Sequence, residues 1–201
     1  MLQNKFINEK CGSVTDPLFL LYGDGMNEKE LDKRINVYDW IESVAVALSI
    51  VIIVLMFFCK IYTVKETSMF PTLENNSKII ALNAYAAPKA GDVVVFENEQ
   101  LKEALIKRVI GVPGDEVMID GQGQVFVNGI LTEYVASGEW NLRGDQTYPL
   151  TVPDGCFFVM GDNRGVSLDS RDTRVGFVRQ NEVCAVAKFV LFPVSKIGVV
   201  K

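Results

Sequence analysis

The sequence predicts a mainly β fold, in which an antiparallel β domain follows one transmembrane helix. Three observations predict this fold class. One long apolar run covers residues 43–59, short β-rich runs separated by turn signals fill the chain from Val64 onward, and no segment of helical periodicity follows residue 100. Hydrophobic residues make up 49% of the 201 residues and charged residues 22%, so a packed core is expected and wholesale disorder is not.

The apolar run 43–59 contains seventeen positions without a charge. At about 1.5 Å per residue it is slightly short of a hydrocarbon core of roughly 30 Å. Trp40 and Tyr62 flank the run as interfacial aromatic residues do, if the amine of Lys60 reaches the headgroups. We therefore expect a transmembrane helix over residues 40–62. A buried core helix or a cleaved signal peptide fits less well, because the run is long and pure and no A-x-A follows it.

Residues 1–39 are expected to form a tail that ends in a short helix. The pattern Asn27-x-x-Glu30 resembles a capping box, and Leu31, Ile35 and Tyr38 follow at helical spacing. We expect this helix to begin near Glu28 and to run into the membrane span. Basic residues on the two sides of the span favour an N-terminus inside the cell only slightly.

The β domain is expected to cover residues 63–201, with no internal repeat and a small insert at about 118–153. Turn signals such as Pro113-Gly114 and Asp154-Gly155 separate the β-rich runs. The dipeptide Asn128-Gly129 predicts a tight hairpin turn after one of these runs. Examples of these runs are Ile79–Leu82, Asp92–Phe96, Leu105–Ile110, Gln124–Val127, Phe157–Met160 and Ala185–Leu191.

The chain contains no histidine, which excludes Ser-His-Asp and Cys-His catalysis and His-ligated zinc. A general base must then be a Lys, Asp, Glu, Tyr, Cys or terminal amine. A net charge of −5 argues against a nucleic-acid partner. The four cysteines form no C-x-x-C pair and no metal-ligand spacing stands out, so we expect no metal and no cofactor. Their spacing leaves open whether Cys156 and Cys184 are bridged.

Three segments combine residues that can carry chemistry. The first is Ser68-Met-Phe-Pro-Thr-Leu, which begins about nine residues after the apolar run and so lies within about 30 Å of its end. The second surrounds Lys107 in the run Ala-Leu-Ile-Lys-Arg-Val-Ile. The third is Gly-Asp-Asn-Arg-Gly-Val-Ser-Leu-Asp-Ser-Arg over residues 161–171. Each also has a purely structural interpretation: a turn before proline, an exposed strand lysine, and a hydrogen-bonded turn with an Asp169–Arg171 ion pair.

Strand alternation places Lys107 on one face of its strand and Arg108 on the other. If Lys107 is buried, desolvation disfavours its ammonium form and lowers its pKa from about 10.4, which leaves a neutral amine as a base near pH 7. Arg108 cannot act in this way, because a guanidinium does not deprotonate at usable pH.

Together the three segments resemble the type I signal peptidases, the membrane-bound serine proteases that remove signal peptides. That family carries boxes of the types S-M-x-P-T-L, K-R-x-x-G-x-P-G-D and G-D-N-R-x-x-S-x-D-S-R, and all three are present here in this order. The resemblance covers about residues 44–195. The single span and the short insert are similar to the compact Gram-positive members. It implies a signal-peptidase-type antiparallel β catalytic domain after one transmembrane helix.

The resemblance also implies residue roles. Ser68 is similar to the family's nucleophile, Lys107 to its general base, and Ser167 to the hydroxyl that orients the lysine amine. The Ser68 backbone N–H is similar to one oxyanion donor. The residues expected to support the site structurally are Met69, Pro71, Asp162, Asn163, Arg164, Asp169 and Arg171.

One position departs from the family pattern. Some members have a serine two positions before the nucleophile, and its hydroxyl donates to the oxyanion, but this chain has Glu66 there. An ionised carboxylate cannot donate a hydrogen bond. We therefore expect Glu66 to point away from the site and Thr67 or water to complete the oxyanion hole.

The resemblance implies that the partners are secreted preproteins and the lipid bilayer, with the tail in the cytoplasm and the catalytic domain outside. Two alternatives remain at this level. A self-cleaving repressor-type peptidase shares a related Ser-Lys β fold, but the membrane span and the third box argue against it. A non-catalytic membrane-anchored β module is disfavoured by the presence of Ser68 and Lys107 together.

Overall fold

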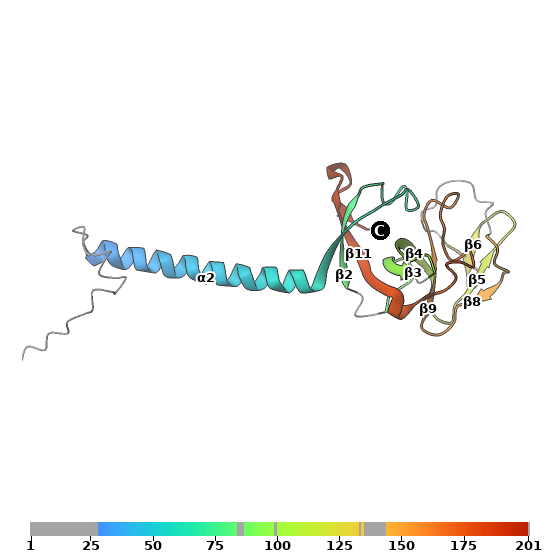
Figure 1. Ribbon diagram of the computed structural model, residues 1–201, viewed down its shortest axis with the longest axis horizontal. Coiled ribbons are helices and arrows are strands. Elements are labelled where there is room, and N and C mark those ends of the chain that lie inside the picture. Colours follow the sequence, from blue (N-terminus) through green and yellow to red (C-terminus); the bar gives the residue numbers. More distant parts are fainter. Residues whose placement is uncertain (1–27, 84–86, 99, 133, 135–143, 201) are drawn as a thin grey trace, which may run out of the picture. The chain divides into compact units, whose positions relative to one another are not determined.

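The computed structural model describes residues 28–83, 87–98, 100–132, 134 and 144–200. The chain divides into two compact units, with the boundary between Ile53 and Val54. The first part of the described chain is one long helix, and every described α-helical residue belongs to it. The rest is built of antiparallel strands with two short 3-10 turns, so the predicted mainly β fold class is confirmed (Figure 1). The expected tail before Asn27 lies outside the described residues.

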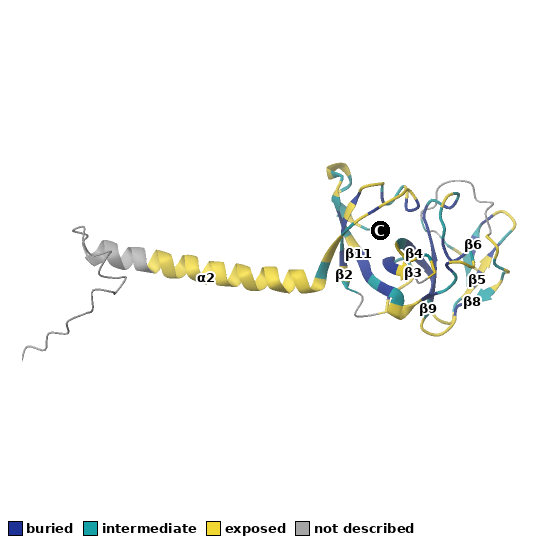
Figure 2. Ribbon diagram, viewed as in Figure 1, coloured by how far each residue is buried: buried dark blue, intermediate teal, exposed yellow. Residues whose placement is uncertain are grey.

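Helix α2 (Glu28–Phe58) begins where the sequence predicts. Its stretch Asn36–Phe58 has a mean hydropathy of 2.7 and none of it is buried, so this helix is long and apolar enough to cross a membrane (Figure 2). The helix ends four residues before the expected Tyr62. Cys59–Thr63 instead form strand β1, in which Tyr62 pairs with Ile79 and packs on the core.

The larger sheet has the strand order β1-β2-β11-β3-β4-β9-β10, with β12 added beside β11. Every neighbouring pair is antiparallel. The expected runs of this region overlap its longer strands, because alternating apolar residues signal half-buried strands locally. Besides β1, the strands are β2 (Lys78–Asn83), β3 (Val93–Asn98), β4 (Glu103–Gly111), β9 (Cys156–Met160), β10 (Val178–Arg179), β11 (Val183–Phe192) and β12 (Gly198–Val199).

A smaller sheet, of order β7-β6-β5-β8, lies in the region expected as an insert. Its strands are β5 (Glu116–Ile119), β6 (Val125–Val127), β7 (Ile130–Leu131) and β8 (Leu150–Thr151). The predicted hairpin joins β6 to β7. Asn128 and Gly129 both have positive φ, 52° and 78°, as a mirror-image two-residue turn requires.

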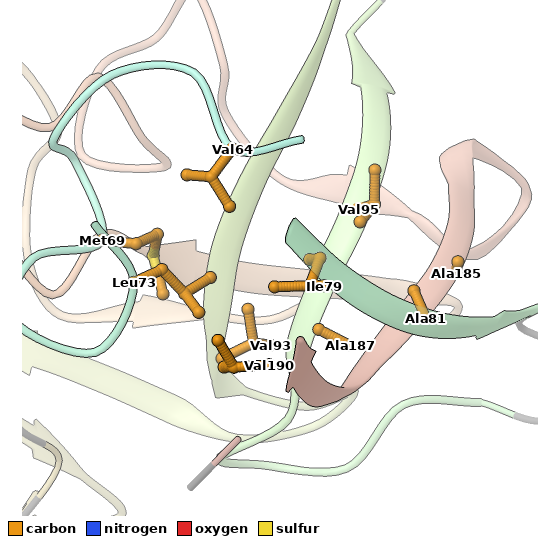
Figure 3. Close-up of a cluster of buried hydrophobic side chains, with 10 residues drawn as sticks. All are labelled: Val64, Met69, Leu73, Ile79, Ala81, Val93, Val95, Ala185, Ala187 and Val190. Carbon is orange, nitrogen blue, oxygen red and sulfur yellow. The ribbon is translucent and has the colours of Figure 1, made fainter. Parts of the chain in front are cut away.

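The core beneath β2, β3 and β11 includes three residues of the segment that follows β1 (Figure 3). Val64, Met69 and Leu73 from that segment are at most 2% exposed and pack on apolar side chains of the sheet. Met69 and Leu73 flank the Phe70–Pro71 turn, so the backbone around Ser68 is fixed by burial on both sides. The sheet residues in this cluster are Ile79, Ala81, Val93, Val95, Ala185, Ala187 and Val190.

Cys59, Cys156 and Cys184 are free thiols, so Cys156 and Cys184 are not bridged. Cys156 packs as a small apolar residue beside the core cluster under the smaller sheet.

Candidate active site

Ser68 lies in a tight turn between β1 and β2. The turn is closed by hydrogen bonds from Phe70 N to Thr67 O (3.0 Å) and from Leu73 N to Met69 O (2.8 Å). The peptide bond between Phe70 and Pro71 is cis. Ser68 itself is 8% exposed, so its hydroxyl sits at the edge of the protein interior.

The third predicted segment holds this turn from the other side. Asn163 donates its backbone N–H to Ser68 O at 2.9 Å and its side-chain amide to Thr67 O at 3.2 Å. Gly161 passes so close that an added Cβ would overlap both the Ser68 carbonyl oxygen and the Ser167 hydroxyl. A glycine is therefore required at this position for the two segments to meet.

Lys107 lies on strand β4 and is 2% exposed. Its Nζ is 2.9 Å from Ser68 Oγ, and the two atoms are hydrogen-bonded. The structure thus brings together the first and second predicted segments, although 39 residues separate these side chains in the chain.

Burial lowers the pKa of Lys107, because the ammonium form loses its hydration. Asp169 and Glu66 act in the opposite direction through their negative charges, and Arg171 reinforces the lowering. Desolvation is the largest of these effects. The buried amine is therefore more easily deprotonated than an exposed lysine.

Asp169 and Arg171 form a buried ion pair in which Arg171 Nε donates to Asp169 Oδ1 at 2.8 Å. Asp169 Oδ2 also accepts the backbone N–H of Gly161 at 2.9 Å, and Arg171 donates to the carbonyl of Arg164 at 2.9 Å. Arg164 in turn donates to Gly161 O at 3.1 Å. These bonds fix the loop that carries Asn163.

The Ser167 hydroxyl is buried and has no hydrogen-bond partner among the described residues. It lies against Gly161 rather than in a hydrogen bond to the Lys107 amine. The orienting contact implied by the family resemblance is therefore not formed in this state, and the role of Ser167 remains a prediction.

Arg108 and Asp162 form a second buried pair that the sequence analysis missed. Arg108 donates through Nε and Nη2 to the two carboxylate oxygens of Asp162, at 2.8 and 2.7 Å, and the residues are 2% and 1% exposed. The Thr72 hydroxyl donates to the same carboxylate, and Arg108 Nη1 donates to Gly91 O at 2.8 Å. Thr72 lies four residues after Ser68, so this network ties the turn that carries Ser68 to β4 behind Lys107.

A cleft of about 380 Å³ opens onto Ser68 and Lys107. One wall is the chain from Tyr62 to Glu66, and the other is residues 103–107 at the start of β4. We expected Glu66 to point away from the site. It instead lines this cleft, and its charge is close enough to act on the pKa of Lys107.

Comparison with known proteins identifies the family. The family model described as "Signal peptidase, peptidase S26" matches residues 37–192. The chain belongs to the signal peptidase family. This confirms the resemblance carried by the three boxes.

Among the relatives, signal peptidase I P of Bacillus subtilis subsp. natto is 36% identical over 185 residues, which cover 86% of this chain and 98% of the relative. Signal peptidase I T of Bacillus subtilis strain 168 is 31% identical over 182 residues, covering 84% and 93%. A solved signal peptidase I from Enterococcus faecalis V583 is 31% identical, with a TM-score of 0.42, and the match covers 50% of this chain and 97% of that one.

Within this signal peptidase, the residues that sequence reasoning missed are Arg108 and Thr72. The available signal was the alternation of side chains along β4, which places Arg108 on the face opposite Lys107. Because a buried charge needs a partner, Arg108 required its own carboxylate on that face. Asp162 was expected to be structural, but its partner could not be assigned, because the two residues are 54 positions apart.

Proposed function

We propose that the protein is a membrane-anchored serine endopeptidase that removes signal peptides from exported preproteins, with Ser68 as nucleophile and neutral Lys107 as general base. The observation that carries this proposal is the 2.9 Å contact between Lys107 Nζ and Ser68 Oγ, because both residues are buried, at 2% and 8% exposed. In a chain without histidine, a buried lysine is the base best suited to activate a serine.

In the acylation step, the Lys107 amine takes the Ser68 hydroxyl proton while Oγ bonds to the scissile carbonyl carbon. The resulting ammonium then gives that proton to the leaving amide nitrogen as the C–N bond breaks. The mature protein departs as the amine, and the signal peptide remains as an ester on Ser68. In deacylation, Lys107 takes a proton from water, the hydroxide attacks the ester, and Ser68 Oγ recovers a proton from the lysine.

The Ser68 backbone N–H is the first donor in the proposed oxyanion hole. Glu66 cannot supply the second donor in its ionised form. Thr67 is exposed beside the cleft, and its hydroxyl or a water molecule fills that role. One such donor is worth about 3–4 kcal/mol in comparable sites.

The substrate segment lies extended along β4 in this proposal. Residues 103–108 of β4 pair with β3, but β4 pairs with β9 only from Arg108 to Gly111. The stretch 103–107 therefore has a strand neighbour on one side and the cleft on the other. A peptide added along this edge gains backbone hydrogen bonds without displacing a strand. The family resemblance adds a preference for small residues at the first and third positions before the cut.

Helix α2 is the proposed single-pass anchor, with the N-terminal tail in the cytoplasm and the catalytic domain, residues 63–201, outside the membrane. Anchoring restricts the search for a membrane-inserted substrate to two dimensions and so raises its effective concentration.

The test is cleavage of a purified preprotein by the full chain in lipid-containing detergent. We expect one product with the N-terminus of the mature protein, and a covalent acyl adduct on Ser68 in quenched reactions. Ser68→Ala should give neither the cleaved product nor the acyl adduct. Its unfolding temperature should equal that of the wild type. If the wild-type chain cleaves no preprotein under any lipid condition, the protein is a binding module rather than a peptidase.

Ser167→Ala is expected to lower kcat about ten- to a hundredfold, because the lysine amine loses a hydroxyl that orients it during turnover. The free energy of unfolding should change little, since the Ser167 hydroxyl makes no hydrogen bond to a described residue in the resting state. Steady-state kinetics and thermal unfolding of the same preparation measure both effects. If Ser167→Ala keeps the pH–rate profile and the kcat of the wild type, Ser167 does not orient the lysine amine.

Glu66→Gln is expected to move the acidic limb of the kcat/KM profile to lower pH. The Glu66 carboxylate stabilises the Lys107 ammonium and raises its pKa, so removing the charge lets the amine stay neutral in more acidic solution. The matched control is Glu103→Gln, because Glu103 lines the same cleft but is not among the charges that act most strongly on Lys107. An unmoved limb, or a shift toward higher pH, would contradict this interpretation.

A further inference from the structure

A lysine near the C-terminus contacts the outer side of the nucleophile turn. Lys196 Nζ donates to the carbonyl oxygen of Pro71 at 2.7 Å and lies 2.9 Å from Glu74 Oε1. The same nitrogen is 5.7 Å from the centre of the Phe70 ring, within range of a cation–π interaction. One side chain thus contacts three residues that closely follow Ser68.

These contacts hold the part of the turn that the core does not. Met69 and Leu73 point into the core and are at most 1% exposed, but Phe70 is 45% exposed. Asn163 holds the turn at Ser68 and Thr67, on the inner side. Thr72 is held through Asp162, whereas Pro71 is only partly buried and its carbonyl oxygen accepts the hydrogen bond from Lys196.

Lys196 is itself presented by a fixed element. It ends the 3-10 turn η2 (Val194–Lys196), in which its N–H donates to Pro193 O at 2.9 Å. The turn joins β11 to β12, and these strands pair through Phe189 with Val199. Lys196 is therefore attached to the same sheet as β4, through β11 and β3.

We propose that Lys196 is a positioning residue for Ser68, which holds the nucleophile turn at the distance that lets Ser68 Oγ meet the Lys107 amine. This inference rests on the proposed function of the Ser68–Lys107 pair. The contacts of Lys196 are partly exposed, with 33% of its side chain accessible, so water can replace them when the lysine is removed. The consequence of losing them is a looser turn and not an unfolded domain.

The geometry separates this role from a purely structural one. A small displacement of Ser68 Oγ lowers the rate of proton transfer and attack, which affects kcat. The cleft lining that would bind substrate does not include Lys196, so KM should change little.

The experiment compares Lys196→Ala with Lys196→Arg and Lys188→Ala in the full chain, using preprotein cleavage in lipid-containing detergent. Lys188 is the matched control, because its Nζ forms an equally short ion pair with Asp92 at 2.8 Å and its side chain is 47% exposed. We expect Lys196→Ala to lower kcat about tenfold with KM within about twofold and the unfolding temperature within a few degrees of wild type. Lys196→Arg should restore most of kcat, since a guanidinium can donate to Pro71 and pair with Glu74. Lys188→Ala should behave as wild type.

A wild-type kcat in Lys196→Ala would overturn the proposal, and so would an equal loss in Lys188→Ala or a loss explained by the unfolded fraction. The nucleophile assignment is tested separately by Ser68→Ala. If Ser68→Ala is inactive while Lys196→Ala is fully active, only the positioning role fails. If Ser68→Ala still cleaves, the proposed function fails, and the positioning role fails with it.

Discussion

Replacing Lys107 with methionine is expected to abolish cleavage and, at the same time, to stabilise the folded protein. The methionine side chain is similar in length and apolar, so it fills the buried site without an amine that must be desolvated. Loss of a general base from a serine protease lowers kcat by at least about 10⁴-fold. Removing the incompletely compensated polar group should raise the free energy of unfolding at pH 7 by about 1–3 kcal/mol.

The sign of the stability change follows from the lowered pKa of Lys107. Between its folded and unfolded pKa values, the unfolded chain binds a proton that the folded chain does not, so the wild-type protein gains stability as the pH rises through this window and loses it as the pH falls. Lys107→Met should lack this dependence, and its advantage over wild type should therefore grow toward acidic pH.

Urea unfolding at several pH values, combined with preprotein cleavage, measures both effects of Lys107→Met. The companion variant is Lys107→Arg, which keeps the positive charge but has no usable neutral form, and it should also be inactive. Cleavage by Lys107→Arg at the wild-type rate would refute the assignment of the general base. In the wild type, activity should fall as the pH is lowered and the amine is protonated.

The longer strands could be predicted from the sequence because alternation and turn residues are local signals. Strand β1 could not. Cys59–Thr63 continues an apolar run and ends near an aromatic residue, which locally resembles the boundary of a transmembrane helix. Its strand conformation depends on pairing with β2, about twenty residues away, and on the burial of Val64 beside it. The two-residue strands β7, β8, β10 and β12 are too short to carry a periodic pattern.

The proposed Ser68–Lys107 pair is predicted from the order and the residues of three sequence motifs, and not from the spacing between them. No local rule places Lys107 beside Ser68, because their contact depends on the path of the chain through β2 and β3. Lys196 and Pro71 are 125 positions apart, and no sequence motif predicts the contact between them. The direction of Glu66 was also beyond local reasoning, since its φ of 77° belongs to a region that non-glycine side chains rarely adopt.

Arg108→Met is expected to cause a larger loss of stability than the substitutions at Ser68, Lys107, Ser167 or Lys196. It would leave the carboxylate of Asp162 in a site that is 1% exposed, with the Thr72 hydroxyl as its remaining side-chain donor among the described residues. Breaking a buried ion pair on one side costs about 3–5 kcal/mol, because the other charge stays buried without compensation. For a chain of this size, that loss corresponds to a fall in the unfolding temperature of about 6–20 °C.

The matched control is Arg174→Met. Arg174 Nη2 lies 2.6 Å from Asp172 Oδ2, as close as the buried pair, but the arginine side chain is 64% exposed. Water screens an exposed ion pair of this kind, so its loss should matter little and this variant should unfold near the wild-type temperature. The double variant Arg108→Met/Asp162→Leu removes both buried charges and should recover much of the stability lost in Arg108→Met. The double variant should still cleave slowly, because Thr72 would lose its carboxylate partner and the turn that carries Ser68 would lose a link to β4.

Equal stability losses in Arg108→Met and Arg174→Met would show that burial does not set the strength of these ion pairs. A double variant as unstable as Arg108→Met would show that the unpaired carboxylate of Asp162 is not the cause of the loss.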